Sequence, residues 1–301
     1  SEPDPDVIQK ARFQPEFRDQ IWDYLDNRVN DESVSEGRRM LQQYKPWLDR
    51  IEARFGVDRH ILLAIWSMES NYGRILERQD VMKSVPQALA TLAYLDLKRA
   101  KFARQQLLAA LKIVQDGHVT PEGLTGSWAG AMGHTQFIPT SYQAYAVDMD
   151  GNGHPDIWRS VPDALATAAN LLRKNGWQSG KSWGYEVVAP AGSAKLERAN
   201  KPLTQWSKLG FKRVSGRAFP APGDNANLLL PAGTGGPAFL MTKNFFVIKR
   251  YNNADKYALG VGHLADRIAG YGDFAQPWPR GYVPLSMEER YEVQQRLTQH
   301  G

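Results

Sequence analysis

Residues 61–73, ILLAIWSMESNYG, place the strongest constraint on how this chain folds. Their apolar side chains recur at the spacing of one helical face, at Ile61, Ile65, Met68 and Tyr72. Asp58 precedes the segment as a suitable N-cap, and Gly73 is predicted to follow the helix as a left-handed C′ residue. The segment therefore predicts a buried helix that carries Glu69 near its C-terminal end.

Glu69 lies at the edge of this apolar face. Apolar surroundings disfavour an ionised carboxyl, and the negative end of a helix dipole does the same. A carboxylic acid that stays protonated near neutral pH can act as a general acid. This segment alone also leaves open the alternative of a solvated Glu69 at the surface, where most Glu side chains lie.

The composition excludes several classes of protein. The 301 residues include no cysteine, which rules out disulfides, thiol chemistry and cysteine-ligated metals. No apolar run approaches the roughly 18 residues of a transmembrane helix. The net charge of +5 suits an anionic polymer, but the Lys and Arg residues are dispersed, so we expect no nucleic-acid binding.

The hydrophobic pattern predicts a mostly α, α+β fold. Helical periodicity is found at 7–29, 35–55, 85–114, 136–147, 161–176 and 254–268. Gly and Pro become frequent after residue 178, and the strand-like runs are 185–188, 239–241 and 245–248. Ser286 and Glu289 form a capping-box pattern that predicts one more helix near the end. We therefore expect a small β-rich insertion within a helical chain.

Three motifs, taken together, resemble one family. MESNYGR ends the Glu69 helix, GSWAGAMGHTQFIPTSYQAYAVD forms a Gly-rich segment at 126–148, and RYNNADKYALGVGHL covers 250–264. In this order they resemble the B family of lytic murein transglycosylases, in the lysozyme superfamily, over nearly the whole chain. The resemblance implies a lysozyme-like catalytic core with a helical N-terminal subdomain.

The resemblance also implies the site residues. Glu69 takes the position of the single catalytic acid and base. The implied substrate-binding residues are Tyr24, Lys98, Arg99, Ser127, Gln136, Tyr251, Asn252 and Tyr257. Lys98 replaces an Arg of the family, and Leu171 stands where some members carry a tyrosine. Read individually, Ser127 could be a turn residue, Gln136 an exposed amide, and Tyr251 and Tyr257 core aromatics.

The implied reaction needs one carboxyl. Ordinary glycosidases use two, and these motifs place no second acid near Glu69. In the family, the acid protonates the oxygen between MurNAc and GlcNAc, and its carboxylate then activates the C6 hydroxyl, which closes a 1,6-anhydro ring. The alternatives are a hydrolytic muramidase and a non-catalytic peptidoglycan-binding protein.

Residues 148–153 match the D-x-[DN]-x-[DN]-G opening of an EF-hand loop. The expected ligands are the side chains of Asp148, Asp150 and Asn152 and the backbone carbonyl of His154. Position 12 is Arg159 instead of Glu, and the resemblance implies a later Asp, Asp163, with Asp156 as the alternative. We expect a structural Ca²⁺ because every ligand is oxygen; a turn that binds no ion is the other interpretation.

The predicted organisation has five parts. They are a helical subdomain at 1–56, the catalytic core with the EF-hand-like loop at 57–177, the β-rich subdomain at 178–249, a segment completing the cleft at 250–270, and a linker with the start of a peptidoglycan-binding module at 271–301. The expected partners are peptidoglycan strands and other cell-wall enzymes. The expected location is the periplasm, with no organic cofactor.

Overall fold

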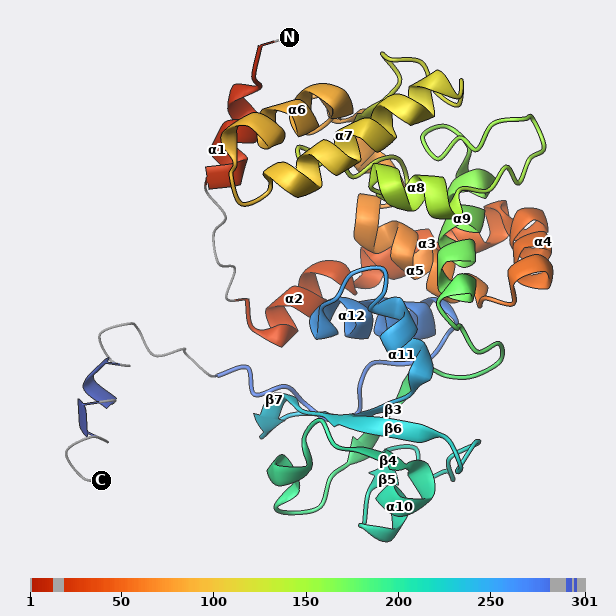
Figure 1. Cartoon of the computed structure of the whole chain (residues 1–301). Helices are drawn as coiled ribbons and strands as arrows, with labels where there is room; N and C mark the ends of the chain where they lie inside the picture. The colour runs from red at the N-terminus through yellow and green to blue at the C-terminus, as the bar shows by residue number, and fades with distance from the viewer. Residues whose placement is uncertain (1, 13–18, 282–290, 294, 297–301) are drawn as a thin grey trace.

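The computed structural model describes residues 2–12, 19–281, 291–293 and 295–296. Within them the helices are α1 (Pro5–Arg12), α2 (Ile21–Arg28), α3 (Asp31–Gln43), α4 (Lys45–Phe55), α5 (Arg59–Ser70), α6 (Val85–Leu95), α7 (Ala100–Gln115), α8 (Pro139–Tyr145), α9 (Val161–Lys174), α10 (Leu203–Lys208), α11 (Lys243–Ile248) and α12 (Asp255–Ile268). Short 3₁₀ helices span Arg74–Glu77 and Ser193–Leu196. The mostly helical α+β fold is confirmed (Figure 1).

Helix α5 lies at the centre of the main core. Residues 61–66 are buried, and α5 packs against α12, α3, α9 and α4. Asp58 caps α5 as predicted, because its side chain accepts hydrogen bonds from the backbone N–H groups of His60 and Ile61. The apolar face read from the sequence therefore becomes the contact surface between α5 and its neighbours.

Helices α6 and α7 form a hairpin at one end of the molecule (Figure 1). Helix α1 packs against α6, and α8 packs against α7. A small separate core joins α1 to the hairpin, consisting of Val7, Ala88, Leu92 and Ala103. This lobe stands apart from α2 and α12, which lie on the other side of α5 in Figure 1.

A five-stranded antiparallel sheet lies at the opposite end of the molecule, with the strand order β4-β6-β8-β3-β5. The strands are β1 (Lys83–Ser84), β2 (Thr125–Gly126), β3 (Gly184–Val188), β4 (Asn200–Pro202), β5 (Lys212–Arg213), β6 (Asn225–Leu229), β7 (Pro231–Thr234) and β8 (Ala238–Met241). Strands β1 and β2 pair separately, beside the Gly-rich segment. The predicted β-rich insertion is present, with its own apolar core around Trp206.

The strand predicted at residues 245–248 is wrong, because these residues belong to helix α11. Asn244, in the first turn of α11, is buried, and its side chain hydrogen-bonds to the backbone of Gln178 and Lys181. Phe245, Val247 and Ile248 are all buried, on a helical turn. Tertiary contacts have overridden the β-propensity of the run.

The tail lies largely outside the described residues. The helix predicted to begin at Ser286 falls in the range 282–290, which the structure does not describe. Among the helices of the described ranges, none combines the length and the apolar composition needed to cross a membrane. The boundaries of the five predicted parts stay a prediction.

Candidate active site

Helix α5 ends in a sharp reversal of the chain. The helix stops at Ser70, and Asn71, Tyr72 and Gly73 all have left-handed backbone, with φ of 51°, 56° and 85°. The prediction that Gly73 is the C′ residue is wrong, since Asn71 already occupies the left-handed C-cap position. The left-handed φ predicted for Gly73 is correct, and a Cβ there would lie 2.3 Å from the His134 ring.

The carboxyl of Glu69 faces α12. The Tyr257 hydroxyl donates a hydrogen bond of 2.6 Å to Glu69 Oε1. Burial raises the pKa of Glu69 to about 7, although the Tyr257 hydrogen bond acts to lower it. Glu69 can therefore be protonated near neutral pH, as a general acid must be.

Two tyrosines of the third motif lie together beside Glu69. The rings of Tyr251 and Tyr257 stack at 6.4 Å with an interplanar angle of 15°. The Tyr251 hydroxyl donates to the carbonyl oxygen of Thr135, in the Gly-rich segment. Burial raises the pKa of both phenols well above 10, and the carboxylate of Glu69 raises them further. Both tyrosines therefore stay neutral donors within electrostatic reach of Glu69.

The Gly-rich segment approaches its neighbours closely. A Cβ on Gly133, which has φ of 70°, would lie 2.4 Å from the carbonyl oxygen of Ile157. Ser127 Oγ accepts from the backbone N–H groups of Ala129 and Ala131, so its side chain shapes the turn. Gln136 has φ of 55°, and its side-chain amide donates to the carbonyl oxygen of Gly133 at 2.9 Å. Both side chains thus hold the loop, whatever else they contact.

His134 is a positioning residue that the sequence interpretation missed. Trp66 Nε1 donates to His134 Nδ1 at 3.1 Å, and the Ser70 hydroxyl donates to the His134 carbonyl oxygen at 2.6 Å. Burial lowers the pKa of His134 to about 4, so the ring is neutral and can accept from Trp66. These bonds fix the Gly-rich segment against the end of α5. The only available signal was the position of His134 inside the second motif.

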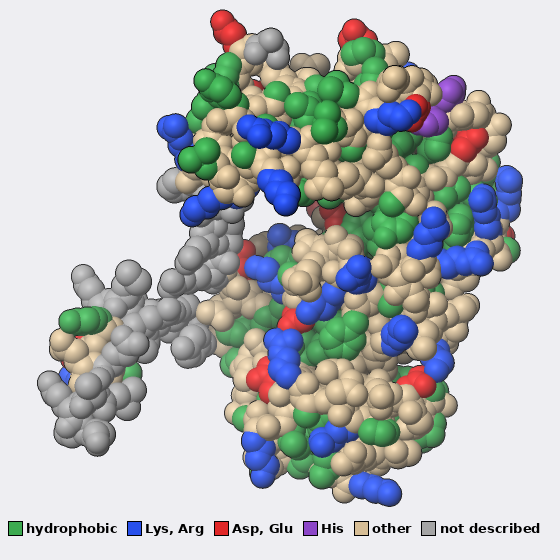
Figure 2. Space-filling view, viewed as in Figure 1, with side chains coloured by type: hydrophobic (Ala, Val, Ile, Leu, Met, Phe, Trp, Pro, Cys, Tyr) green, Lys and Arg blue, Asp and Glu red, His purple; other side chains and the backbone are tan. Residues whose placement is uncertain are grey.

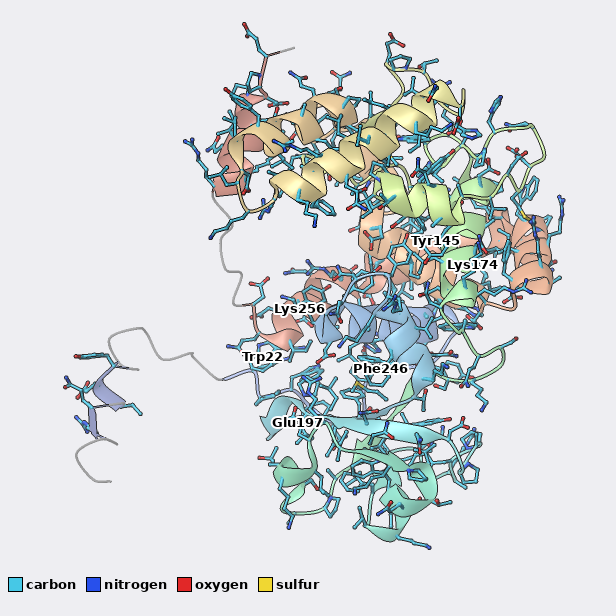
Figure 3. The ribbon with its side chains drawn as sticks, in the orientation of Figure 1. Trp22, Tyr145, Lys174, Glu197, Phe246 and Lys256 are labelled. Carbon is cyan, nitrogen blue, oxygen red and sulfur yellow. The ribbon has the colours of Figure 1, made fainter. Side chains whose placement is uncertain are left out.

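Tyr24 reaches the site from α2. Its ring lies under the Arg28 guanidinium, 3.7 Å from the ring centroid, and the Lys256 ammonium is 5.1 Å from the same centroid. Lys256 lies at the start of α12, on the side that faces α2 (Figure 3). Burial raises the pKa of Tyr24, Arg28 lowers it, and the Glu69 carboxylate adds to the increase. The two cations around Tyr24 were not predicted.

The remaining predicted residues are dispersed. Lys98 and Asn252 are exposed. Arg99 lies 3.6 Å from the Asp96 carboxylate and 5.4 Å from the centroid of the Trp128 ring. Its Nη1 is buried without a hydrogen-bond partner among the described residues. Arg99 thus contacts Trp128 of the Gly-rich segment. Lys98 forms no ion pair with a described residue.

A hollow separates the two sides of this site. Figure 2 shows it between the lobe of α6 and α7 and the lobe of α2 and α12. Tyr24 and Tyr257 belong to the second lobe, whereas Arg99 belongs to the first. A cavity of about 1140 Å³ lies elsewhere, at the start of α5, and Glu69 does not line it.

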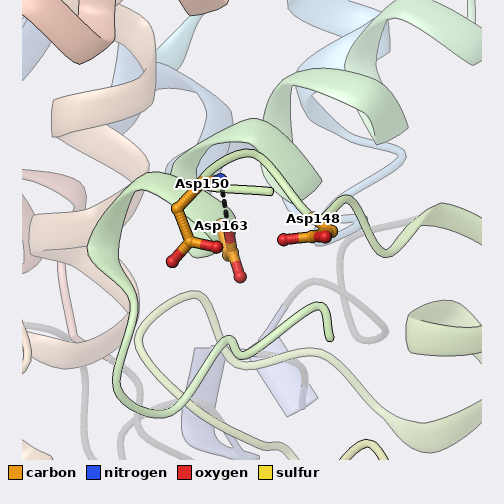
Figure 4. A group of neighbouring side chains, drawn as sticks. All are labelled: Asp148, Asp150 and Asp163. Atoms are coloured by element: carbon orange, nitrogen blue, oxygen red, sulfur yellow. Dashed lines mark hydrogen bonds between the residues drawn. The ribbon is translucent and has the colours of Figure 1, made fainter. Parts of the chain in front are cut away.

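Three carboxyls of the EF-hand-like loop come together. Asp148, Asp150 and Asp163 each place an oxygen within 4.8 Å of the others (Figure 4). Asp163 is fully buried at the start of α9 and accepts from the backbone N–H groups of Met149, Asp150 and Asp156. Burial raises its pKa, those three hydrogen bonds oppose the shift, and the charge of Asp150 adds to it. Hard oxygen donors of like charge fit a divalent cation such as Ca²⁺.

The other expected ligands lie around this group. Asn152 Oδ1 accepts from the backbone N–H of His154 at 3.0 Å. Asp156 accepts from the backbone N–H groups of Trp158 and Arg159, so it caps the following turn and does not join the group. Of the two later aspartates considered, the structure therefore brings Asp163 to Asp148 and Asp150.

A second partly buried carboxyl, Asp266, lies at the other end of α12 and was not predicted. Trp183 Nε1 donates to Asp266 Oδ2 at 3.1 Å, and burial raises the pKa of Asp266 to about 7. Asp58 and His60, at the start of α5, are close enough to influence this pKa. Together these residues line the cavity described above.

Chemically, the Glu69 site can deliver and take back one proton. Its side chain is partly buried, and its pKa depends on desolvation and on Tyr257, with no second carboxyl of the described residues contributing. The neutral phenols of Tyr251 and Tyr257 lie beside it, and hydroxyl groups of this kind can hold a polar ligand by hydrogen bonds.

Comparisons with known proteins identify the family of this chain. The family model described as Transglycosylase SLT domain matches residues 1–266. Membrane-bound lytic murein transglycosylase B of Escherichia coli (strain K12) is 32% identical over 247 residues, covering 82% of this chain; the chain spans 66% of that relative's length.

Solved structures are similar as well. SltB3 from Pseudomonas aeruginosa in complex with NAG-NAM-pentapeptide is 47% identical with a TM-score of 0.91, covering 100% of this chain and 80% of that one. The lytic transglycosylase Slt35 from Escherichia coli in complex with calcium is 28% identical with a TM-score of 0.76, covering 88% of this chain and 83% of that one. The resemblance to the B-type lytic murein transglycosylases is confirmed, and this chain belongs to the family of transglycosylase SLT domains.

Proposed function

We propose that this chain is a peptidoglycan lytic transglycosylase that cleaves the β-1,4 bond between MurNAc and GlcNAc without adding water. The observation that carries the proposal is one partly buried carboxyl, Glu69, with a pKa near 7 and a tyrosine as its partner. A relative at 47% identity forms a complex with NAG-NAM-pentapeptide, which supports the same substrate class here.

The proposed reaction uses Glu69 twice. Protonated Glu69 gives its proton to the glycosidic oxygen, the bond from that oxygen to MurNAc C1 breaks, and GlcNAc leaves as an alcohol. The MurNAc C6 oxygen then bonds to C1 and passes its proton to the Glu69 carboxylate. The products are a new chain end and a 1,6-anhydro ring, and the enzyme returns to its starting protonation state.

The surrounding residues would orient the strained sugar. Tyr257 holds one Glu69 oxygen, and Tyr251 ties the turn between α11 and α12 to the Gly-rich segment. We propose that Tyr24, Ser127, Gln136 and Asn252 contact the glycan and that Lys98 and Arg99 meet its negatively charged groups. Tyr24, Ser127, Gln136 and Asn252 are neutral, so they would orient the substrate without placing a positive charge beside the acid that lowers its pKa.

Isotope-labelled product analysis tests the proposal. Sacculi digested in ¹⁸O-water should yield 1,6-anhydro-MurNAc ends without label by mass spectrometry. A muramidase would instead give reducing ends that carry ¹⁸O, and this result would reject the lytic reaction in favour of hydrolysis. Unchanged solubilisation by the Glu69→Gln variant would point to a non-catalytic binding protein.

We also propose a structural Ca²⁺ held by Asp148, Asp150 and Asp163, with Asn152 and the His154 carbonyl completing the loop. The proposal is supported by the cluster of three carboxylates that includes buried Asp163 and by the calcium complex of a relative. When bound, the ion would supply charge balance and stiffness to the segment that follows the Gly-rich loop.

Calcium titration tests this site. The wild-type chain should bind Ca²⁺ by calorimetry and melt at a higher temperature, gaining about 2.7 kcal/mol at 100 times the Kd. Asp148→Ala should lose the heat and the shift, whereas Asp116→Ala, which removes an exposed carboxyl nearby, should keep both. A calcium response that survives Asp148→Ala would move the site elsewhere.

The proposed location is the periplasm, where peptidoglycan lies, with other cell-wall enzymes as further partners. Fractionation of cells that express the natural gene, followed by detection of the protein, would check the location.

A further inference from the structure

The hairpin of α6 and α7 exposes an unusual amount of apolar surface. Twelve large hydrophobic side chains are exposed in the described residues, and six of them lie between residues 94 and 111. We call the exposed side of residues 94–112 the hairpin face. Its apolar members are Tyr94, Leu95, Leu97, Phe102, Leu108 and Leu111. Concentrated apolar exposure of this kind marks an interaction surface.

The exposed fractions show that these side chains do not merely lie at the margin of the core. Leu97 is 92% exposed, Tyr94 79% and Leu108 69%. Leu108 and Leu111 are three residues apart on α7, so they share one side of the helix. The same side carries Lys101 and Arg104. The hairpin face is therefore apolar and basic at once.

The positive charge of the hairpin face is not neutralised. Lys101 and Arg104 form no ion pair with another described residue. The two carboxylates nearby are already paired, Asp96 with Arg99 and Asp116 with Lys112. Figure 2 shows hydrophobic side chains and Lys or Arg side chains side by side over this lobe. Exposed leucines among unpaired cations are typical of helices that bind anionic lipid interfaces.

Other occupants fit less well. Sugars stack on flat aromatic rings, and most of the hairpin face is aliphatic. A stable protein partner would have to supply acidic groups for Lys101 and Arg104 as well as an apolar surface, whereas an anionic bilayer supplies both in any orientation. The hairpin also lies at the end of the molecule opposite the sheet (Figure 1), so a planar surface can approach it.

We propose that the hairpin face binds the surface of membranes that contain anionic phospholipid. Leu97, Leu108 and Leu111 would enter the boundary between headgroups and acyl chains, and Lys101 and Arg104 would contact the phosphates. This contact would hold the catalytic lobe at a fixed height beside a membrane. It is independent of the proposed cleavage reaction.

Vesicle sedimentation with the full chain tests the proposal. The protein should pellet with vesicles of phosphatidylcholine and phosphatidylglycerol and stay in solution with phosphatidylcholine alone. Binding should weaken as salt is added, because exposed charges are screened.

The Lys101→Glu/Arg104→Glu variant should bind roughly 25-fold less tightly or worse, at about fivefold per basic residue. The Leu97→Ser/Leu108→Ser/Leu111→Ser variant should lose at least about tenfold.

Matched controls come from the β-rich region. Lys208→Glu/Lys212→Glu makes the same change in net charge, and Val188→Ser/Leu209→Ser removes exposed apolar side chains. Both controls should keep vesicle binding, and all four variants should keep the wild-type melting temperature and their activity on soluble glycan. Equal loss in the controls would assign binding to overall charge and overturn the proposal. Failure of the wild-type chain to bind either vesicle would also overturn it and leave a protein as the partner.

Discussion

Helices α5 and α12 pack against each other, and a partly buried carboxyl lies at each end of their contact. Glu69 lies at the end of α5 and meets Tyr257 near the start of α12. Asp266 lies near the end of α12, close to Asp58 and His60 at the start of α5. Burial raises the pKa of both acids to about 7. The two sites are therefore similar in protonation and differ in what surrounds them.

The difference lies in the groups that face each acid. Glu69 is surrounded by neutral phenols and by a Gly-rich segment held in place through His134. Asp266 accepts from an indole N–H and has another carboxyl, Asp58, nearby. A raised pKa marks a candidate acid, but structural groups can have one too. The geometry around the acid, more than its pKa, separates catalysis from structure.

Replacing each acid by its amide should give the largest contrast. Glu69→Gln removes the transferable proton, so turnover of peptidoglycan should fall by roughly 10²–10⁴-fold, the usual contribution of general acid–base catalysis. Asp266→Asn should keep turnover within about twofold, because Asp266 lies away from the reacting bond. Release of soluble fragments from sacculi measures both.

A loss of activity in Asp266→Asn equal to that in Glu69→Gln would break the comparison. Thermal melting of both variants provides the control, since a folded but inactive Glu69→Gln protein separates catalysis from unfolding.

The pH dependence of stability should distinguish the acids next. Both carboxyls have a raised folded pKa, so their contribution is complete below their unfolded pKa, near 4, and is lost as pH rises through about 7. His134 and His263 have a folded pKa lowered to about 4 by burial, so their contribution is complete above about 6.5 and is lost as pH falls through about 4. Because these contributions change in opposite directions, the free energy of unfolding of the wild-type protein should vary little between about pH 4 and 7.

Glu69 and Asp266 each contribute stability that decreases as pH rises, and Asp266→Asn removes one of these two contributions. As pH rises from about 4 to 7, its free energy of unfolding should therefore rise by about 4 kcal/mol relative to wild type. Urea unfolding at several pH values measures this difference. Parallel curves for variant and wild type would mean that Asp266 titrates at its ordinary pKa.

Much of helix α5 and of the acidic loop could be predicted, because the sequence patterns that specify them involve residues close together in the chain. The apolar period of α5 and the Asp58 cap depend on residues a few positions apart, and both are present in the structure. Asp148 and Asp150 belong to one short loop pattern, and Asp163 lies within reach along the chain. Local spacing was therefore enough to predict where Glu69 lies on its helix and where most of the acidic loop lies in the chain.

Contacts between distant segments could not be predicted this way. The bond between Glu69 and Tyr257 joins positions 188 residues apart, and only the family resemblance placed them together. Asp266 gives no sequence signal, because an Asp in an amphipathic helix is usually exposed. Its burial depends on Trp183, 83 residues away. The strand predicted at 245–248 failed for the same reason, since tertiary packing decided its conformation.

Removing the donor at each acid should give the smallest and most specific effect. Tyr257→Phe removes the hydroxyl that stabilises the Glu69 carboxylate, so the pKa of Glu69 should rise and the alkaline limb of the kcat/KM profile should move to higher pH. Its maximal rate should fall by roughly 10-fold to 100-fold, as expected for a lost hydrogen bond to a charged group. Trp183→Phe removes the corresponding donor to Asp266 and should leave the pH–rate profile in place. A shift of the pH–rate profile in both variants would show that the Glu69 and Asp266 sites are coupled through α5 and α12. A shift in Tyr257→Phe alone would assign the kinetic pKa to Glu69.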